Sequence, residues 1–322
     1  MKPLSRRELL KFSAVGALAA AQTGCDDSEF SPGPPGNSAV SILRAPNYSA
    51  DLVGRMLEGA KQCGLDARGK RVLLKPNLVE FDPQTVINTN VAVVAAAIEL
   101  FQRLGAAEII VGEGPGHRRD TYDLAEVADY RKGIPQFDRR FVDLNRDDVS
   151  AVKQFADEPE FFFPNTVLGA DLIVSLAKMK THHWAGATLS MKNFFGVVPG
   201  AIYGWPKNKL HTIGIPHSIA ALRRTFPRSF AIVDGIVGME GNGPIQGSPK
   251  QAGVLVMGAD LVAVDATCCR IMGIDPQKLE YMVLTAETGH VFENRIEQRG
   301  EKIAAVRTNF KLGDLFGHVR LA

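Results

Sequence analysis

The residues best suited to chemistry gather in one stretch near the middle of the chain, SLAKMKTHHWAGATLSMKNFFGVVPG, which runs from residue 175 to residue 200. It contains three lysines and two adjacent histidines. If the chain stays extended up to His183, successive side chains alternate between the two faces of the strand, so Lys178, Lys180 and His182 share one face. Cations on one face repel each other unless a negative group lies between them. The stretch therefore predicts a partner for the lysines, which is either the phosphate or carboxylate of a ligand or an acidic side chain of the protein.

A solvated basic loop is the alternative interpretation of this stretch, because lysine is common on protein surfaces. Its aromatic neighbours argue against that alternative, since Trp184, Phe194 and Phe195 are unusual in a freely exposed loop.

The second half of the stretch predicts a short helix from Gly186 to Phe195. Thr188 and Lys192 stand four residues apart and would share one face of that helix. Lys192, followed by Asn193, would either bind an anion or stabilise the C-terminal end of the helix. The sequence leaves both roles open.

Apolar runs alternate with segments of helical period along the rest of the chain. Strands are expected at Arg71 to Lys75, Glu108 to Val111, residues 140–144, Asp171 to Lys178, residues 230–244 and residues 252–258. The strand within residues 230–244 is expected to open into a glycine-rich loop. Helices are expected at Val91 to Leu104 and residues 259–274. Continuous runs of Val, Ile and Leu are typical of strands buried on both faces. The alternation predicts an α/β fold with a largely parallel sheet flanked by helices.

Polar residues follow the predicted strands. The clusters are Lys75 with Asn77, Glu113 with His117, Lys178 to His183, and Asp234 with Glu240. Ligands of open α/β sheets bind beyond the carboxyl ends of the strands. We therefore expect Lys75, Glu113, His182 and Asp234 to meet along one edge of the sheet.

Two loops add to this picture. GEGPGH, residues 112–117, follows a strand as phosphate-binding loops do, although it lacks the GxGxxG spacing. YGWPKNKLHTIGIPHS, residues 203–218, is either a lid over the site or an irregular fixed connection.

The residue types support several chemical roles. His182 would be a general base or a metal ligand, Lys180 and Lys192 would hold an anionic group, and Glu113 would transfer protons. Lys75, Asn77, Lys178 and Asn193 would bind the ligand. His182, Asp234 and Glu240 are a candidate ligand set for a divalent metal, although no HExxH or other tight spacing organises them.

The N-terminus resembles an export signal. In SRRELLK, adjacent Arg6 and Arg7 precede an apolar run, as in a twin-arginine signal peptide over residues 1–24. QTGC, residues 22–25, resembles a lipoprotein cleavage box that would leave Cys25 lipidated at a membrane face; ordinary cleavage near Ala19 to Ala21 is the alternative. The twin-arginine machinery exports folded proteins, so the chain is expected in the periplasm or at the extracytoplasmic face of a membrane.

A polar tract rich in Pro and Gly follows the signal, and residues 25–39 are expected to form a disordered tether. Residues 40–322 would then form the α/β domain, as one unit or as two closely joined lobes. The first 24 residues carry four basic side chains and one acidic one, so their removal turns a net charge of +2 into −1. That balance argues against nucleic-acid binding.

The cysteines exclude an iron–sulfur cluster. Apart from Cys25 they are Cys63, Cys268 and Cys269, and no CxxC occurs. Two states are compatible with the sequence. Either Cys63 forms a disulfide with Cys268 or Cys269, or all three cysteines are buried thiols.

Five motifs together resemble the DUF362 family, a domain of unknown function. They are LLKPNLV, IIVGEGPGH, LAKMKTHHWAGATLSMKNFFGVVPG, IVDGIVGMEGNGPIQG and VAVDATCCRIMGI, and they run in order from Val72 to Ile274. The resemblance implies an α/β domain without naming a reaction. Some family members carry a ferredoxin-like module, for which this chain has no cysteines. The positions to which the resemblance points are Lys75, Asn77, Glu113, Lys180, His182, Lys192, Asn193, Asp234, Glu240 and Asp265.

Three functions fit these observations. The first is an exported enzyme, or a redox accessory that depends on a metal or another cofactor, acting on an anionic small molecule. The second is a non-catalytic periplasmic protein that binds an anionic ligand or a metal. The third is an assembly factor. Catalysis usually needs an acid, a base and an electrophile together, and the sequence supplies all three types, which favours the enzyme.

Overall fold

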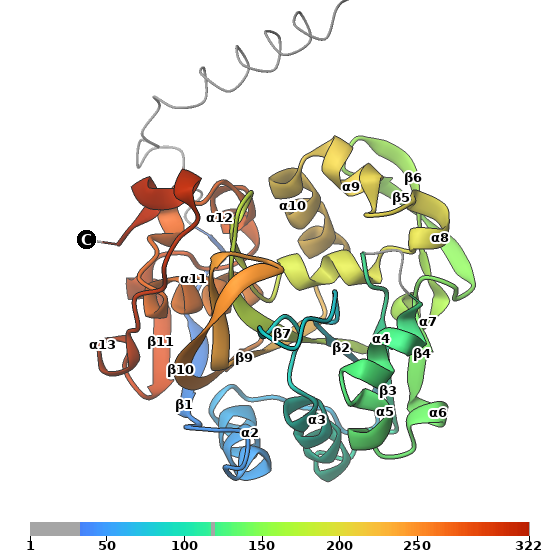
Figure 1. Cartoon of the computed structure of the whole chain (residues 1–322), viewed down its shortest axis with the longest axis horizontal. Helices are drawn as coiled ribbons and strands as arrows, with labels where there is room; N and C mark the ends of the chain where they lie inside the picture. The colour runs from blue at the N-terminus through green and yellow to red at the C-terminus, as the bar shows by residue number, and fades with distance from the viewer. Residues whose placement is uncertain (1–32, 117–119, 322) are drawn as a thin grey trace, which may run out of the picture. The chain divides into compact units, whose positions relative to one another are not determined.

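A large mixed sheet lies at the centre of the computed structural model, which describes residues 33–116 and 120–321 (Figure 1). Its strands are β1 Ser38–Arg44, β2 Arg71–Pro76, β3 Glu108–Glu113, β4 Phe141–Asp143, β7 Leu172–His182, β8 Gly186–Thr188, β9 Ser229–Asn242, β10 Gln246–Gly258 and β11 Ile296–Gly300. The strand order is β11-β1-β10-β9-β7-β2-β3-β4, and β8 pairs with β7. A separate antiparallel pair is formed by β5 Val149–Phe155 and β6 Glu158–Pro164.

One half of the large sheet is parallel. β2 lies between β3 and β7 and is parallel to both, β3 is parallel to β4, and β7 is parallel to β9. In the other half, β10 is antiparallel to both β9 and β1, while β1 and β11 are parallel. The prediction of an α/β fold with a largely parallel sheet is confirmed.

Helices cover both faces of this sheet. α2 Leu52–Gln62 and α3 Val91–Arg103 lie on one face, whereas α10 Ile215–Thr225, α11 Leu261–Ile271 and α12 Glu280–Thr285 lie on the other (Figure 1). Asn90 caps the start of α3 by accepting a hydrogen bond from the backbone N–H of Ala92. Beyond its last turn, Gly105 takes a φ of 76°, which favours glycine.

Short helices complete the fold. They are α4 Thr121–Val127, α5 Tyr130–Gly133, α6 Phe137–Arg140, α7 Asn165–Leu168, α8 Gly200–Tyr203, α9 Asn208–Ile213 and α13 Ile303–Val306, with 3-10 turns η2 Lys192–Val197, η3 Pro276–Lys278, η4 Ala286–Thr288, η5 Glu293–Arg295 and η6 Asp314–Val319.

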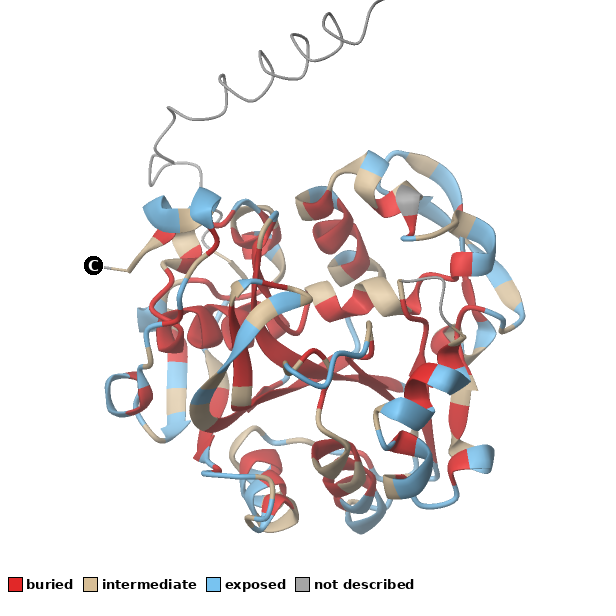
Figure 2. Ribbon diagram, in the orientation of Figure 1, coloured by how far each residue is buried: buried red, intermediate tan, exposed pale blue. Residues whose placement is uncertain are grey.

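Burial follows the position of each element in the layers. Every residue of β7 and of α11 is buried, whereas β5, β6 and β11 keep exposed residues (Figure 2). A strand that is covered on both faces needs apolar residues at successive positions, which is why β7 carries no simple alternation.

Two sequence expectations about local structure are wrong. The helix expected from Gly186 to Phe195 is instead β8, which pairs antiparallel with β7, followed by the 3-10 turn η2. Gly186 has a φ of 76°, so the chain reverses into a hairpin before a helix can begin. The glycine-rich loop expected within residues 230–244 is strand up to Asn242, because β9 and β10 form a long hairpin.

The N-terminal predictions fall mostly outside the described residues. The signal peptide, Cys25 and the first part of the tether lie there, while Ser38 and Ala39 at the end of the tether belong to β1 and pair with β11. Cys63, Cys268 and Cys269 are free thiols. Among residues 33–116 and 120–321, no helix combines the length and apolar character needed to cross a membrane.

A buried ion pair joins the neighbouring parallel strands β7 and β9. Lys178 and Asp234 face each other in register, and the ammonium donates to the carboxylate at 2.7 Å. Tyr48 accepts from Lys178 at 2.9 Å and donates to Asp234 at 3.1 Å. The carboxylate also accepts the N–H of Asn90, which fixes the start of α3. Lys178 and Asp234 therefore have structural partners on all sides.

Replacing Asp234 by Asn should strongly destabilise the fold. The change leaves the Lys178 ammonium buried without its counter-charge, which typically costs about 3–5 kcal/mol. The measurement is the free energy of unfolding in urea. Glu287→Gln is the control, because Glu287 pairs with Arg224 at the surface and its loss should cost less than about 1 kcal/mol. Equal small losses for both variants would show that the buried pair does not stabilise the fold.

Candidate functional site

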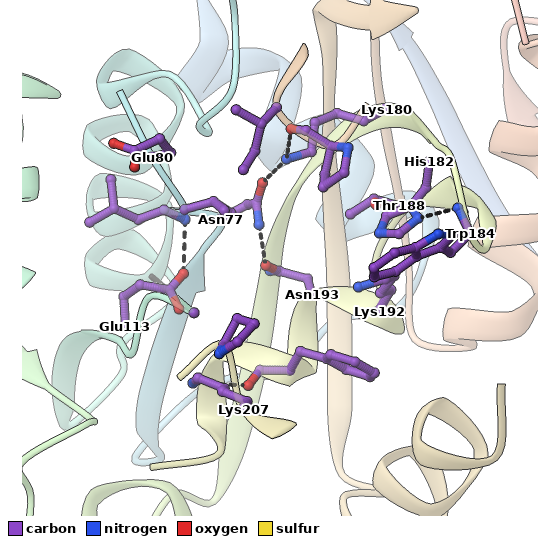
Figure 3. Close-up of a pocket in the computed structure, with 18 of the residues that line it drawn as sticks. Asn77, Glu80, Glu113, Lys180, His182, Trp184, Thr188, Lys192, Asn193 and Lys207 are labelled. Carbon is purple, nitrogen blue, oxygen red and sulfur yellow. Dashed lines mark hydrogen bonds between the residues drawn. The ribbon is translucent and has the colours of Figure 1, made fainter. Parts of the chain in front are cut away.

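A cavity of about 540 Å³ lies beyond the carboxyl ends of β2, β3 and β7. Its wall includes residues that follow all three strands, the turn η2, the segment before α9 and the end of the β9–β10 hairpin. Figure 3 shows Glu80 and Glu113 on one side of it and His182, Trp184, Thr188 and Lys192 on the other. Four lysines and two glutamates line the cavity, so it favours negatively charged ligands.

Lys75 and Glu113 form a buried ion pair in the wall. The Lys75 ammonium donates to Glu113 Oε2 at 2.6 Å and to the carbonyl of Pro76 at 2.7 Å. Glu113 also accepts the N–H groups of Leu78 and Gly114, both at 2.9 Å. Burial lowers the pKa of Lys75, while Glu113 favours its charged form. Because its oxygens already accept these three donors, Glu113 acts as an anchor for the loops after β2 and β3.

Asn77 and Asn193 extend this network across the floor of the cavity (Figure 3). Asn193 Oδ1 accepts from Lys75 at 3.1 Å and from Asn77 Nδ2 at 3.3 Å. Asn193 Nδ2 donates to the carbonyl of Lys75 and to Ser175 Oγ. The two asparagines therefore tie η2 to β2 and β7.

Lys180 is fully buried and has no carboxylate partner among its hydrogen bonds. Its ammonium donates to Asn77 Oδ1 at 2.7 Å and to the carbonyls of Ile87 and Pro244 at 3.0 and 3.3 Å. Burial first, and then the charges of Lys192 and Lys178, lower its pKa far below the ordinary value. Its three acceptors leave it no unused donor when it is charged.

His182 presents a hydrogen-bond donor to the cavity. Its Nδ1 accepts the N–H groups of Trp184 at 3.0 Å and Ala185 at 3.1 Å, so the proton of the neutral ring resides on Nε2. Burial and the nearby Lys192 lower the pKa of His182, which keeps the ring neutral. No described residue accepts a hydrogen bond from Nε2.

Lys192 and Thr188 have unused hydrogen-bonding capacity beside His182. The Lys192 ammonium lies 4.1 Å from the centre of the Phe195 ring and has no hydrogen-bond acceptor or carboxylate among the described residues. Burial lowers the pKa of Lys192 to about 8. The buried hydroxyl of Thr188 likewise lacks a partner within the described part of the chain. Among the described residues, these two groups and His182 Nε2–H have no protein acceptor, and they are called the free donors of the cavity.

Lys207 lines the cavity although sequence reasoning did not single it out. Its ammonium donates to the carbonyls of Gly114 at 2.6 Å, Phe195 at 3.1 Å and Val198. Burial lowers its pKa to about 7, whereas the three carbonyls stabilise the charged form. Lys209, two residues on, pairs with Glu158 instead. The sequence marked this segment as a lid or fixed connection but did not distinguish its two lysines.

Lys178, Asp234 and Glu240 do not line the cavity. Asp234 is occupied by Lys178, and Glu240 accepts the N–H of Lys311 at 2.9 Å and pairs with Lys250 at 3.5 Å. The ligand-binding role expected for Lys178 is therefore not supported.

The metal set predicted from His182, Asp234 and Glu240 is not brought together. In residues 33–116 and 120–321, no three His, Cys, Asp or Glu side chains converge as metal ligands would. His117, another donor considered from the sequence, lies outside the described residues. The groups of the cavity wall without a protein partner, namely the Lys192 ammonium, His182 Nε2–H and the Thr188 hydroxyl, are hydrogen-bond donors, which suit an anion better than a cation.

Comparison with known proteins identifies the family. The profile of the family described as Domain of unknown function (DUF362) matches residues 72–270, which is more than half of the chain. The chain belongs to the DUF362 family.

Two further similarities were found. The chain is 28% identical over 265 residues to the Thylakoid-associated protein sll1697 of Synechocystis sp., covering 78% of this chain and 79% of that protein. It also resembles the lactate racemase apoprotein of Thermoanaerobacterium thermosaccharolyticum, with a TM-score of 0.46 and 11% identity over 78% of this chain. The chain spans 59% of the length of that racemase.

Asp265, a position to which the DUF362 resemblance points, supports the site from behind. It is fully buried on α11 and accepts from Ser190 Oγ at 2.5 Å and from the N–H groups of Ser190 and Met191. These bonds fix the turn that leads into Lys192. Burial raises the pKa of Asp265 to about 7. Asp265 is thus a positioning residue and does not reach the cavity.

Asp265→Asn should change how stability depends on pH. Because the folded-state pKa lies above the ordinary value of 3.8, the folded protein holds this proton to higher pH than the unfolded chain does. The Asp265 contribution to stability therefore falls as the pH rises from 3.8 to about 7, by at most about 4 kcal/mol. The free energy of unfolding, measured in urea between pH 5 and pH 7.5, should decrease more in the wild type than in Asp265→Asn.

Asp157→Asn is the matched control, since Asp157 is exposed and the chemical change is the same. Its stability should follow the wild type across this range. Parallel curves for the wild type and Asp265→Asn would contradict the raised pKa.

Proposed function

We propose that this DUF362 chain is an enzyme that binds an anionic small molecule beside Lys192 and acts on it there. The observation that carries the proposal is the set of unused donors on one side of the cavity: the Lys192 ammonium, His182 Nε2–H and the Thr188 hydroxyl. A phosphate or carboxylate group accepts several hydrogen bonds and would satisfy all three donors. A buried donor without a partner is costly, and the Thr188 hydroxyl is such a group, so this side of the cavity favours a ligand that supplies an acceptor.

Lys192 is also the group best suited to move a proton. A pKa of about 8 leaves a part of its amines unprotonated at neutral pH, and the side chain is reachable from the cavity. His182 Nε2–H also lines the cavity and would stabilise negative charge that develops on the ligand, whereas the donors of Lys180 are taken up within the protein. Substrate binding and proton transfer would thus use neighbouring groups.

A non-catalytic binding protein is the second candidate. It is favoured by the state of Lys75, Lys180, Lys207 and Glu113, whose donors and acceptors are taken up within the protein. These groups shape the cavity and its positive potential without being free to react. Binding without turnover would decide for this candidate.

A location outside the cytoplasm is part of this proposal. We propose that the twin-arginine signal carries the folded chain to the periplasm and that lipidation of Cys25 holds it at the membrane face. The name of the thylakoid-associated relative supports a membrane location. The described residues begin beyond both features, so these proposals rest on the sequence and on that relative.

Lys192→Met should weaken anion binding by about tenfold or more, because it removes one charge-assisted hydrogen bond while keeping the apolar stem. Isothermal titration with inorganic sulfate, whose charge is constant from pH 7 to pH 9, measures the affinity. In the wild type the affinity should fall as the pH rises through about 8, where Lys192 loses its proton. Lys192→Arg should abolish that pH dependence.

Lys61→Met is the control, because Lys61 is an exposed lysine on α2 that does not line the cavity. Turnover is tested by mass spectrometry of a small-molecule extract incubated with each protein. Consumption of an anionic compound by the wild type and Lys61→Met, but not by Lys192→Met, supports the enzyme. Equal sulfate affinity in all three proteins would refute the anion site.

Replacing both Arg6 and Arg7 by Lys should retain the protein in the cytoplasm of a bacterium that has the twin-arginine route. Lys2→Arg, which also exchanges basic residues near the N-terminus, should leave export unchanged. Cys25→Ser should move the exported protein from the membrane fraction to the soluble fraction. Cell fractionation with immunoblotting measures all three. Export of the double variant at the wild-type level would rule out the twin-arginine route.

A further inference from the structure

An aromatic rim borders the free donors of the cavity. Trp184 is 62% exposed and lines the mouth beside His183, His211 and Phe195. Its ring meets His183 at an angle of 65° and His211 at 76°, so neither neighbour lies flat against it. Figure 3 shows Trp184 on the same side of the cavity as Thr188 and Lys192. A single exposed tryptophan is ordinary on a protein surface, but here it stands within the wall of a ligand cavity.

The size of the cavity gives an independent constraint. A volume of about 540 Å³ lies in the range of pockets that enclose whole organic ligands, and it exceeds what a phosphate or carboxylate group needs alone. The free donors occupy only the His182–Lys192 side. The ligand must therefore extend beyond its anionic group.

We propose that the ligand of this site joins a planar aromatic ring to its anionic group. The ring stacks on the exposed indole of Trp184, while the anion accepts hydrogen bonds from Lys192 and His182 Nε2. Stacking on tryptophan suits any flat π-system and needs no specific hydrogen bonds from the ring. This inference rests on the proposed anion site and adds the chemical class of the ligand.

Three matched probes separate the two halves of the ligand. Adenosine 5′-monophosphate carries both a ring and an anion, ribose 5-phosphate carries only the anion, and adenosine carries only the ring. Isothermal titration of the full-length protein should show the first binding about tenfold or more tightly than either of the others. Flavin mononucleotide and riboflavin repeat the comparison with a larger ring.

Variants assign each half to its residue. Trp184→Ala should reduce the affinity for the mononucleotides to that for ribose 5-phosphate and leave ribose 5-phosphate unchanged, whereas Trp184→Phe should restore most of the loss. Lys192→Met should reduce the affinity for adenosine 5′-monophosphate to that for adenosine. Leu315→Ala is the control, since Leu315 is 73% exposed and does not line the cavity.

The outcomes distinguish this inference from the function on which it rests. If ribose 5-phosphate binds in a Lys192-dependent way and neither mononucleotide binds more tightly, the ring proposal is wrong and the anion site stands. Equal losses for mononucleotides and ribose 5-phosphate in Trp184→Ala would also overturn the ring proposal. If Lys192→Met changes no affinity, the anion site itself is wrong.

Discussion

The buried ion pair between Lys75 and Glu113 is the interaction on which the rest of the site depends. It joins the ends of β2 and β3, and the remaining hydrogen bonds of both side chains fix the loop after β2 and the turn η2. Burying a charge is costly unless a partner compensates it, so these backbone segments have little freedom to move apart. Asn193, which accepts from Lys75, then carries this constraint to the residue beside it, Lys192.

The four lysines of the cavity wall differ in whether their ammonium groups already have hydrogen-bond acceptors within the protein. Lys75, Lys180 and Lys207 each donate to at least three fixed acceptors, two of which are carbonyls in the case of Lys180. Lys192 has only the face of the Phe195 ring within the described part of the chain. The buried lysines thus give the cavity a positive potential, while the groups that are free to contact a ligand lie on the side formed by His182, Thr188 and Lys192. This division explains why one lysine carries the proposed function although four line the wall.

The strands of the large sheet contribute unequally to the cavity wall. The parallel strands β2, β3 and β7 end at the cavity, whereas β9 and β10, which pair antiparallel with each other, contribute mainly the end of their hairpin. Lys178 on β7 and Asp234 on β9 pair across two adjacent central strands, which accounts for their complete burial. The match to the family over residues 72–270 runs from β2 through most of α11, and so it includes the cavity wall and Asp265 but not β1 or β11.

The sequence by itself determined the layered α/β fold, because continuous apolar strands that alternate with amphipathic helices have few other ways to bury their surfaces. It also placed Lys75, Asn77, Glu113, Lys180 and His182 near one another, since polar residues after parallel strands meet at one edge. Lys192 and Asn193, which the sequence assigned to a short helix, line the same cavity from η2. Only the tertiary structure decided which charged side chains pair. Asp234 pairs with Lys178, Glu240 pairs with Lys250, and Lys207 reaches the cavity wall from a loop that is distant in the sequence. Partner choice depends on distances between segments far apart in the chain, and local sequence patterns do not contain those distances.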